Sequence, residues 1–278
     1  NPRTARVIVN RIWQHHFGRG IVPTPNDFGV LGLPPTNPEL LDWLAVEMIE
    51  RDWSIKSMHR LLMNSHAYQA SSELDPVAYR IDPANELLWR FQPRRLAAEE
   101  IRDSILSVSG NLNLAVGGQG VYPPMPEEIL QTSSRPDQAW GRATPEQAAR
   151  RSLYIHQKRS LVHPMMSSFD VADMDNSCPV RFATVQPTQA LTMLNGEFTN
   201  QQAVIMADRL QEAAPGNLRE QVELALELLT QGPPAPEDVD ESMELMHDLE
   251  QSHGHSPRRA LELFCLMGLN LNEFLHLD

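Results

Sequence analysis

Lysine, cysteine and long apolar runs are scarce in this sequence, and each scarcity excludes a class of protein. Only Lys56 and Lys158 are lysines, and the net charge of the 278 residues is -13. Nucleic-acid binding draws most of its affinity from clustered basic side chains that release counterions, so this charge balance argues against a nucleic-acid partner. No apolar run approaches the roughly 18 residues of a membrane-spanning helix. We therefore expect neither a nucleic-acid partner nor a membrane span.

The local signatures of several common enzyme classes are also missing. The sequence contains no HExxH, GxSxG or Walker motif, and no GxGxxG followed by a fitting helix. These absences argue against typical zinc proteases, α/β hydrolases and nucleotide-binding enzymes. There is no CxxCH, so the chain offers no covalent haem site. The two cysteines, Cys178 and Cys265, are compatible with one disulfide or with two free thiols.

The first residues show neither a start methionine nor the charged-then-apolar pattern of a signal peptide. We expect an excised piece of a larger protein, whose localisation cannot be read from its end. Acidic charge is concentrated in the C-terminal third, because residues 197–256 alone sum to about -11. Hydrophobic residues make up 41% of the chain, which is enough for the core of one large or two ordinary domains.

Proline follows a helix-capping residue at several points and divides the sequence into helices. Asn1-Pro2 and Asn37-Pro38 are examples, because the capping side chain accepts from the first turn and proline lacks only an N–H that would be unpaired anyway. Apolar residues at helical spacing fill the segments between these points. The helices predicted in this way cover residues 2–17, 40–51, a third helix capped by Ser54, 84–91, 96–109, 187–210, 217–230, 236–251 and 257–276.

A short alternating run over 151–157 is the best strand candidate in the sequence. Because a strand has to pair, we expect a small hairpin or sheet built from 121–131 and 151–160. Glycine and proline over 110–145 predict either a mobile flap or an internal boundary. The expected fold class is mainly α: a multi-helix globular bundle with long Pro/Gly-rich loops and at most a small β-hairpin or sheet around 121–160.

The expected organisation is one domain over residues 1–278 with a possible division into three parts. Residues 1–109 form an N-terminal helical part, and residues 110–186 form a loop-rich part with the small β element and a polar central motif. Residues 187–278 form an acidic helical bundle.

The central motif, residues 169–196, concentrates polar side chains in a segment with two prolines. A loop of this composition seldom exists only to join helices. Its carboxylates are compatible with three roles: oxygen ligands for calcium or magnesium, helix caps and ion pairs with Arg159 and Arg181, or a catalytic or ligand-binding site. The spacing does not fit an EF-hand loop, and we predict no metal. The carboxylates concerned are Asp170, Asp173 and Asp175.

Cys178 and the histidines are the candidate nucleophile and bases. Arg181 follows Cys178 by three residues and favours a thiolate, but a nucleophilic cysteine also needs a histidine base from elsewhere. A disulfide with Cys265 and a buried structural thiol are the alternatives, and the structural thiol is the default. His15 and His16 are adjacent, so on a helix they point about 100° apart and cannot both bind one metal.

Several stretches of the sequence are similar to one family. They are NPRTARVIVNRIWQHHFGRGIVPTPNDFG at 1–29, RRLAAEEIRDSILSVSGNL at 94–112, FDVADMDNSCPVRFATVQPTQALTMLNGEF at 169–198 and NEFLHLD at the end. They resemble the C-terminal domain of unknown function of planctomycete and verrucomicrobial multidomain secreted proteins, which often carry an upstream cytochrome-c-like domain. The resemblance implies export to the periplasm or cell surface, with upstream domains of the same polypeptide as partners. It places any haem on a separate upstream domain, so we expect no cofactor in this chain.

The positions marked in that family are mostly polar residues that a plain helical core would not require. In this sequence they fall at Asn10, Arg11, His15, Asp27, Arg102, Asp103, Asp170, Cys178, Arg181, Gln189 and Asn195.

Two functional hypotheses follow. The first is a non-catalytic accessory module that binds complex polysaccharide or docks to a redox partner. The second is a hydrolytic or lyase-type enzyme with a polar pocket built from the first helix and the central motif. In that pocket His15 would be the general acid or base, Asp170 would orient it or act as a second acid, and Arg181 would bind an anionic or carbonyl group.

Overall fold

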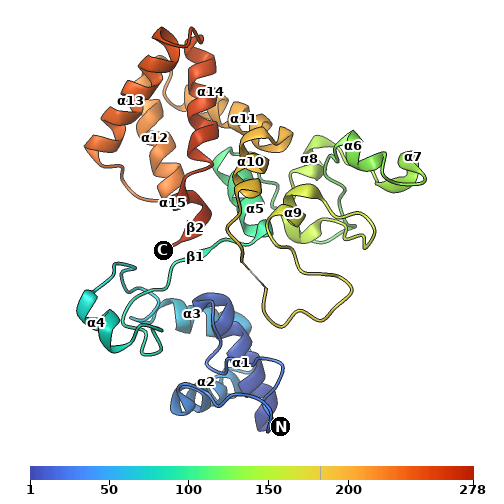
Figure 1. Cartoon of the computed structure of the whole chain (residues 1–278), viewed down its shortest axis with the longest axis vertical. Helices are drawn as coiled ribbons and strands as arrows, with labels where there is room; N and C mark the ends of the chain where they lie inside the picture. The colour runs from blue at the N-terminus through green and yellow to red at the C-terminus, as the bar shows by residue number, and fades with distance from the viewer. Residues whose placement is uncertain (182) are drawn as a thin grey trace. The chain divides into compact units, whose positions relative to one another are not determined.

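The computed structural model describes residues 1–181 and 183–278, apart from the side chain of Pro2, and it contains two compact units. The first unit is formed by residues 1–94 with Asp278, and the second by residues 95–277 (Figure 1). The mainly α fold class is confirmed, because helices make up most of the regular structure in both units. The three-part division stays a prediction, although the helix expected at 96–109 lies in the second unit. Within the described residues, no helix combines the length and the apolarity needed to cross a membrane.

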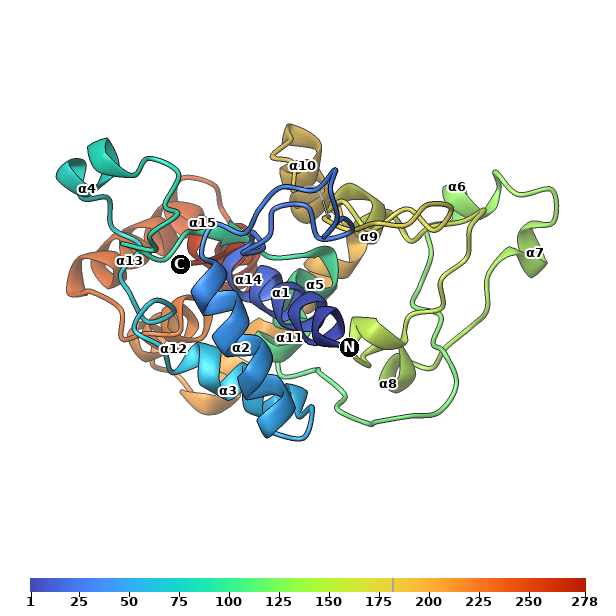
Figure 2. The same ribbon diagram turned by 90° about the horizontal axis from the view of Figure 1, so that it is seen from below.

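The first unit is built on three helices that share one apolar core. Asn37 and Ser54 cap two of them as predicted, since their side chains accept hydrogen bonds from the amides of Leu40 and Ser57. The three helices lie side by side (Figure 2). Buried residues of all three, such as Met58 at 0% exposure, form the core. The helices of this unit are α1 (Pro2–Phe17), α2 (Pro38–Glu50), α3 (Ile55–Met63) and the short α4 (Pro76–Ile81).

The helix predicted at 84–91 is wrong, because this segment is a series of turns. The carboxylate of Asp82 accepts hydrogen bonds from the amides of Glu86 and Leu87, at 3.0 and 2.7 Å. Asn85 and Leu88 have φ of 52° and 56°, in the left-handed region that a right-handed helix does not use. A local side-chain bond has therefore replaced the backbone ladder of a helix.

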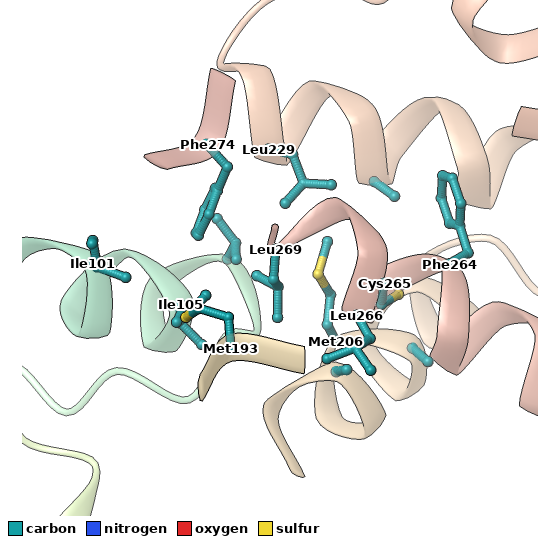
Figure 3. Close-up of a cluster of buried hydrophobic side chains, with 14 of the residues drawn as sticks. Ile101, Ile105, Met193, Met206, Leu229, Phe264, Cys265, Leu266, Leu269 and Phe274 are labelled. Atoms are coloured by element: carbon teal, nitrogen blue, oxygen red, sulfur yellow. The ribbon is translucent and has the colours of Figure 1, made fainter. Parts of the chain in front are cut away.

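The second unit is a larger helical assembly with its own core. Ile101, Ile105, Met206 and Leu269 are each 0% exposed and lie in the cluster that Figure 3 shows. Cys265 is buried in the same core, whereas Cys178 is exposed, and both are free thiols. The elements from the boundary onward are β1 (Arg94–Arg95), α5 (Ala98–Val108), α6 (Glu127–Leu130), α7 (Pro136–Ala139), α8 (Pro145–Ala148), η1 (Ser152–Tyr154), α9 (Pro164–Ser168), α10 (Pro187–Asn195), α11 (Glu197–Ala213), α12 (Leu218–Thr230), α13 (Pro236–Gln251), α14 (Pro257–Gly268), α15 (Asn272–Leu275) and β2 (His276–Leu277).

The β structure differs in place from the expectation. The two-stranded sheet pairs β1 with β2. The segments 121–131 and 151–160 pair through an isolated bridge between Val121 and Ile155. Side chains of α5 bond to the backbone at the start of the segment predicted as a strand, 151–157, and just before it. Asp103 accepts the amide of Ser152 at 2.6 Å, and Arg102 donates to the carbonyl of Arg150 at 3.0 Å, so a turn of η1 forms instead.

The helix predicted at 257–276 is two helices, α14 and α15. The helix predicted at 187–210 is also two helices, α10 and α11, that join at Gly196. Gly196 has ψ of 132°, which breaks the helical path. A Cβ at this position would lie 2.4 Å from the carbonyl oxygen of Thr192. The absence of a side chain at Gly196 therefore permits the close approach of the two helices.

Candidate functional site

The central motif lies in the second unit and is organised around Asp170. This residue has φ of 59°, and its carboxylate accepts from the Arg95 guanidinium at 2.7 Å and from the Thr184 amide at 2.9 Å. Partial burial is the largest single effect and raises the pKa of Asp170, but the hydrogen bonds from Thr184 and Arg95 together outweigh it and lower the pKa. Asp170 is therefore an anionic anchor that holds together segments far apart in the chain.

Two further contacts hold the central motif in the second unit. Arg181 donates to both carboxylate oxygens of Glu99, at 2.8 and 3.1 Å. The side chain of Gln189, which is 6% exposed, donates to the carbonyl of Ser168 at 3.0 Å. These polar groups bond within the fold. Within the described part of the chain, Arg181 pairs with Glu99, and not with a carboxylate of the central motif as the sequence suggested. Asn195 is the exposed last residue of α10.

The acidic residues at the tip of the motif also bind one another and a nearby arginine. Asp173 accepts from the amide of Asp175 at 2.9 Å and from the side chain of Asn176 at 2.6 Å, and Arg159 pairs with Asp175. Among the described residues, no three His, Cys, Asp or Glu side chains are grouped so that they could hold a metal ion. The thiol of Cys178 is exposed and donates to the carbonyl of Val180 at 3.3 Å, so the buried structural thiol predicted for this residue is wrong.

Arg102 and Asp103 are neighbours on α5 with structural contacts. Arg102 is 1% exposed and donates to the carbonyls of Ala148 and Arg150 and to the hydroxyl of Ser152. Burial lowers the pKa of Arg102 to about 10, and Asp103 partly opposes this effect. Both residues fix the backbone around η1.

The predicted site residues of the first unit also have local partners. Asn10 is 0% exposed and binds both the amide and the carbonyl of Val22, at 2.7 and 3.1 Å. A Cβ on Gly20 would lie 2.7 Å from the Asn10 amide nitrogen, so glycine allows this contact. Arg11 donates to the side chain of Asn26 at 3.1 Å, and Asp27 accepts the amide of Gly29 at 2.8 Å. These contacts shape the loop after α1.

His15 lies on the exposed side of α1 in the first unit, whereas Asp170 and Arg181 belong to the second unit. The catalytic grouping of these three side chains stays a prediction. Within the second unit the structure brings Asp170 and Gln189 to 3.5 Å and Arg102 and Asp103 to 4.0 Å.

A cavity of about 670 Å³ lies in the first unit, and sequence reasoning did not predict it. The wall from α1 and α2 is apolar and includes Trp13, Leu40, Trp43 and Leu44. Trp13 is packed against Phe17 with ring centroids 4.0 Å apart, whereas Trp43 is 49% exposed. A cavity of this size, with aromatic walls and a few polar groups, is typical of ligand sites.

The other edge of this cavity is polar and comes from α3 and its C-cap. Ser57, Arg60 and Asn64 line it at helical spacing, so their side chains lie along one side of the helix. Ser57 donates its hydroxyl to Ser54 at 3.0 Å. Within residues 1–181 and 183–278, neither the Arg60 guanidinium nor the side-chain amide of Asn64 makes a hydrogen bond or an ion pair. The cavity therefore combines an aromatic wall with hydrogen-bonding groups that the fold does not use.

One sequence signal could have indicated this cavity. The apolar residues of α2 extend beyond the stripe that faces the core, and Trp43, Val46 and Ile49 are each about half exposed. A group of exposed apolar residues often marks an interaction site, whereas a single exposed apolar residue is common on any protein surface. A second hollow of about 330 Å³ has its charged residues, Arg6 and Asp42, paired with each other at 2.5 Å.

The comparisons with known proteins give a family without an assigned activity. No curated protein and no solved structure matches this chain. One family model matches residues 1–246, which include all of the first unit's residues up to Arg94 and a large part of the second unit. The chain belongs to the family PSD1, described as "Protein of unknown function (DUF1553)".

Proposed function

We propose that this chain is a non-catalytic binding module and that the cavity of the first unit binds a short segment of polysaccharide. The observation that carries the proposal is the division of the cavity into an aromatic wall with Trp43 and a polar edge with Arg60 and Asn64. A pyranose ring has the matching division, with an apolar C–H face and an edge of hydroxyl groups.

The physical chemistry of the two surfaces supports a sugar over a purely apolar ligand. An aromatic ring offers a large rigid apolar face at low entropic cost, and its electron-rich face attracts polarised C–H groups. Arg60 and Asn64 supply donors and an acceptor that would stay unused against a hydrocarbon chain. A buried hydroxyl needs such partners, because desolvation without a hydrogen bond is costly.

The contacts of the central motif also favour a binding role for the chain. Asp170, Arg181 and Gln189 all use their polar atoms to close the loop within the second unit. A catalytic acid or base needs a polar atom in reach of a substrate proton. The proposal therefore assigns these residues to folding and assigns ligand binding to the first unit.

The cellular setting is part of the same proposal. Export to the periplasm or cell surface would bring the module to polysaccharide, and upstream domains of the same polypeptide would act on what it binds. In this proposal any haem and any redox partner belong to an upstream domain. This chain then binds the polysaccharide and holds it near the upstream domains.

Titration of the 278-residue chain with neutral and acidic hexasaccharides, followed by tryptophan fluorescence and calorimetry, tests the proposal. Trp43→Ala should weaken binding about tenfold or more, which corresponds to ~1.4 kcal/mol. Trp53→Ala is the matched control, because Trp53 is 43% exposed in the same unit but does not line the cavity. The proposal is wrong if no saccharide binds, or if the two substitutions weaken binding equally.

A further inference from the structure

The charge of the cavity is opposite to the charge of the chain. The whole chain carries -13, yet the residues that line this cavity include Arg51 and Arg60 and no carboxylate. Charged residues of one sign around a partly enclosed space raise the local concentration of ions of the opposite sign. An acidic protein with a basic cavity therefore indicates that the ligand is an anion.

The two arginines are not equivalent. Arg51 is paired with Glu47 at 2.8 Å on the same helix end, and this carboxylate offsets its charge. Arg60 lies on α3, where the neighbouring cavity residues are the uncharged Ser57 and Asn64. Arg60 is thus the residue that gives the polar edge its positive charge.

We infer that the cavity selects an acidic glycan, whose carboxylate or sulfate group binds Arg60 while its sugar ring packs on Trp43. This inference rests on the proposed function and names the class of saccharide. The planar guanidinium presents parallel N–H donors that match the oxygens of a carboxylate or a sulfate ester. The Asn64 amide is one turn further along the helix and is placed to donate to a third oxygen of the same sugar.

The partial exposure of the site predicts how this contact responds to salt. Arg60 is exposed to solvent, so its attraction to an anion is screened as the ionic strength rises. The stacking contact on Trp43 has no such dependence, because it does not involve net charge. Added salt should therefore weaken an acidic glycan and leave a neutral glycan unchanged.

The test uses two pairs of ligands that differ only in charge. A hexagalacturonate is compared with its methyl ester, and a sulfated galactan hexasaccharide with its desulfated form, at 50 and 500 mM salt by calorimetry on the 278-residue chain. We expect each acidic member to bind at least tenfold more tightly at low salt and to lose this advantage at high salt. The acidic member that binds more tightly identifies whether carboxylate or sulfate is the natural group.

Substitutions then test whether Arg60 is the residue that causes the preference for acidic glycans. Arg60→Gln should reduce the acidic-to-neutral ratio to about one while the neutral ligand keeps its affinity. Lys56→Gln removes the same charge from an exposed position of α3 that does not line the cavity, so it should keep the ratio. The thermal midpoint should be unchanged in both variants, because neither side chain is buried.

Each contrary result points to a different error. Equal affinity for acidic and neutral members, or an equal loss of preference in Lys56→Gln, overturns the acidic-glycan inference and leaves the binding module intact. If neither member of either pair binds, the proposed function itself fails.

Discussion

Arginine has two opposite roles in this protein, one seen at three residues of the second unit and the other at Arg60 of the first unit. In the second unit Arg95, Arg102 and Arg181 donate to carboxylates and carbonyls of their own fold. In the first unit Arg60 lines a cavity and faces solvent. The same side chain is thus a structural link in one unit and the candidate ligand-binding group in the other. The two roles differ because the surroundings of the arginine side chains differ.

Arg150 shows how far the structural role extends. Its guanidinium donates to the carbonyls of Ala115, Gly117 and Gln119 and lies 4.0 Å from the centre of the Tyr154 ring. The Gly-rich segment predicted to be a flap or a boundary is therefore wrapped around a cation in this region. Gly117 has φ of 82°, which glycine adopts without strain, so the segment can turn its carbonyls toward Arg150.

The same substitution at a buried arginine and at the cavity arginine tests this comparison most strongly, because the two variants should lose very different amounts of unfolding free energy. Arg102→Met would leave the carbonyls of Ala148 and Arg150 buried without donors, so we expect a loss of about 3 kcal/mol in unfolding free energy. Arg60→Met should change it by less than about 0.5 kcal/mol. Urea unfolding followed by circular dichroism measures both. Equal losses would mean that Arg60 also has a structural role.

Asp170→Asn should have the next largest effect, because it removes the charge that pairs with Arg95. We expect a loss of about 1–2 kcal/mol at pH 7. The folded state lowers the pKa of Asp170, so its contribution is present above the unfolded pKa and is lost as the pH falls through the folded value. The difference between the parent and Asp170→Asn should therefore shrink below about pH 4.

Asp137→Asn is the control for this acid-unfolding series. Asp137 is exposed on α7 in the same unit, so its substitution should leave the profile unchanged. A constant difference between the parent and Asp170→Asn from pH 7 to pH 3 would contradict the anchoring role of the carboxylate.

A smaller effect is expected at the histidine pair of the first unit. His16 Nε2 lies 2.7 Å from His59 Nδ1, which joins α1 to α3. Burial, and then the positive charges of His59, Arg94 and His15, lower the pKa of His16. The folded state therefore binds this proton less well than the unfolded chain, and the stability of the first unit should fall as the pH drops below about 6.5.

His16→Gln should flatten this dependence between pH 7.5 and 5. Four of the five tryptophans, Trp13, Trp43, Trp53 and Trp89, belong to the first unit, so tryptophan fluorescence reports mainly on its unfolding. His66→Gln serves as the comparison, because His66 is exposed in the same unit. An unchanged slope in His16→Gln would exclude the pair as its source.

Local rules predicted many helices of both units but failed at 84–91, where the carboxylate of Asp82 accepts the amides of Glu86 and Leu87. Capping residues and prolines placed α1, α12 and α13 within a residue of their observed bounds. The strand at 151–157 failed because the carboxylate of Asp103, on α5, takes the backbone amide of Ser152. No local pattern contains that information.

The candidate site residues could be predicted from the sequence, but their partners in the fold could not. The polar residues of the central motif could be singled out from composition, but the partner of Asp170 is Arg95, 75 positions away. The cavity was missed because it arises where α1, α2 and α3 meet, and the exposure of Trp43 depends on that packing. A sequence indicates that a helix is unusually apolar, whereas only the assembled unit indicates which residues are left uncovered.

The most direct test of the cavity as the ligand site is a nuclear magnetic resonance titration of the five tryptophan indole N–H signals with hexagalacturonate. We predict a saturable shift of the Trp43 signal, while Trp53, outside the cavity in the same unit, and Trp140, in the second unit, stay in place. A shift of Trp140 without Trp43 would move the site to the second unit and contradict the division of roles between the two units.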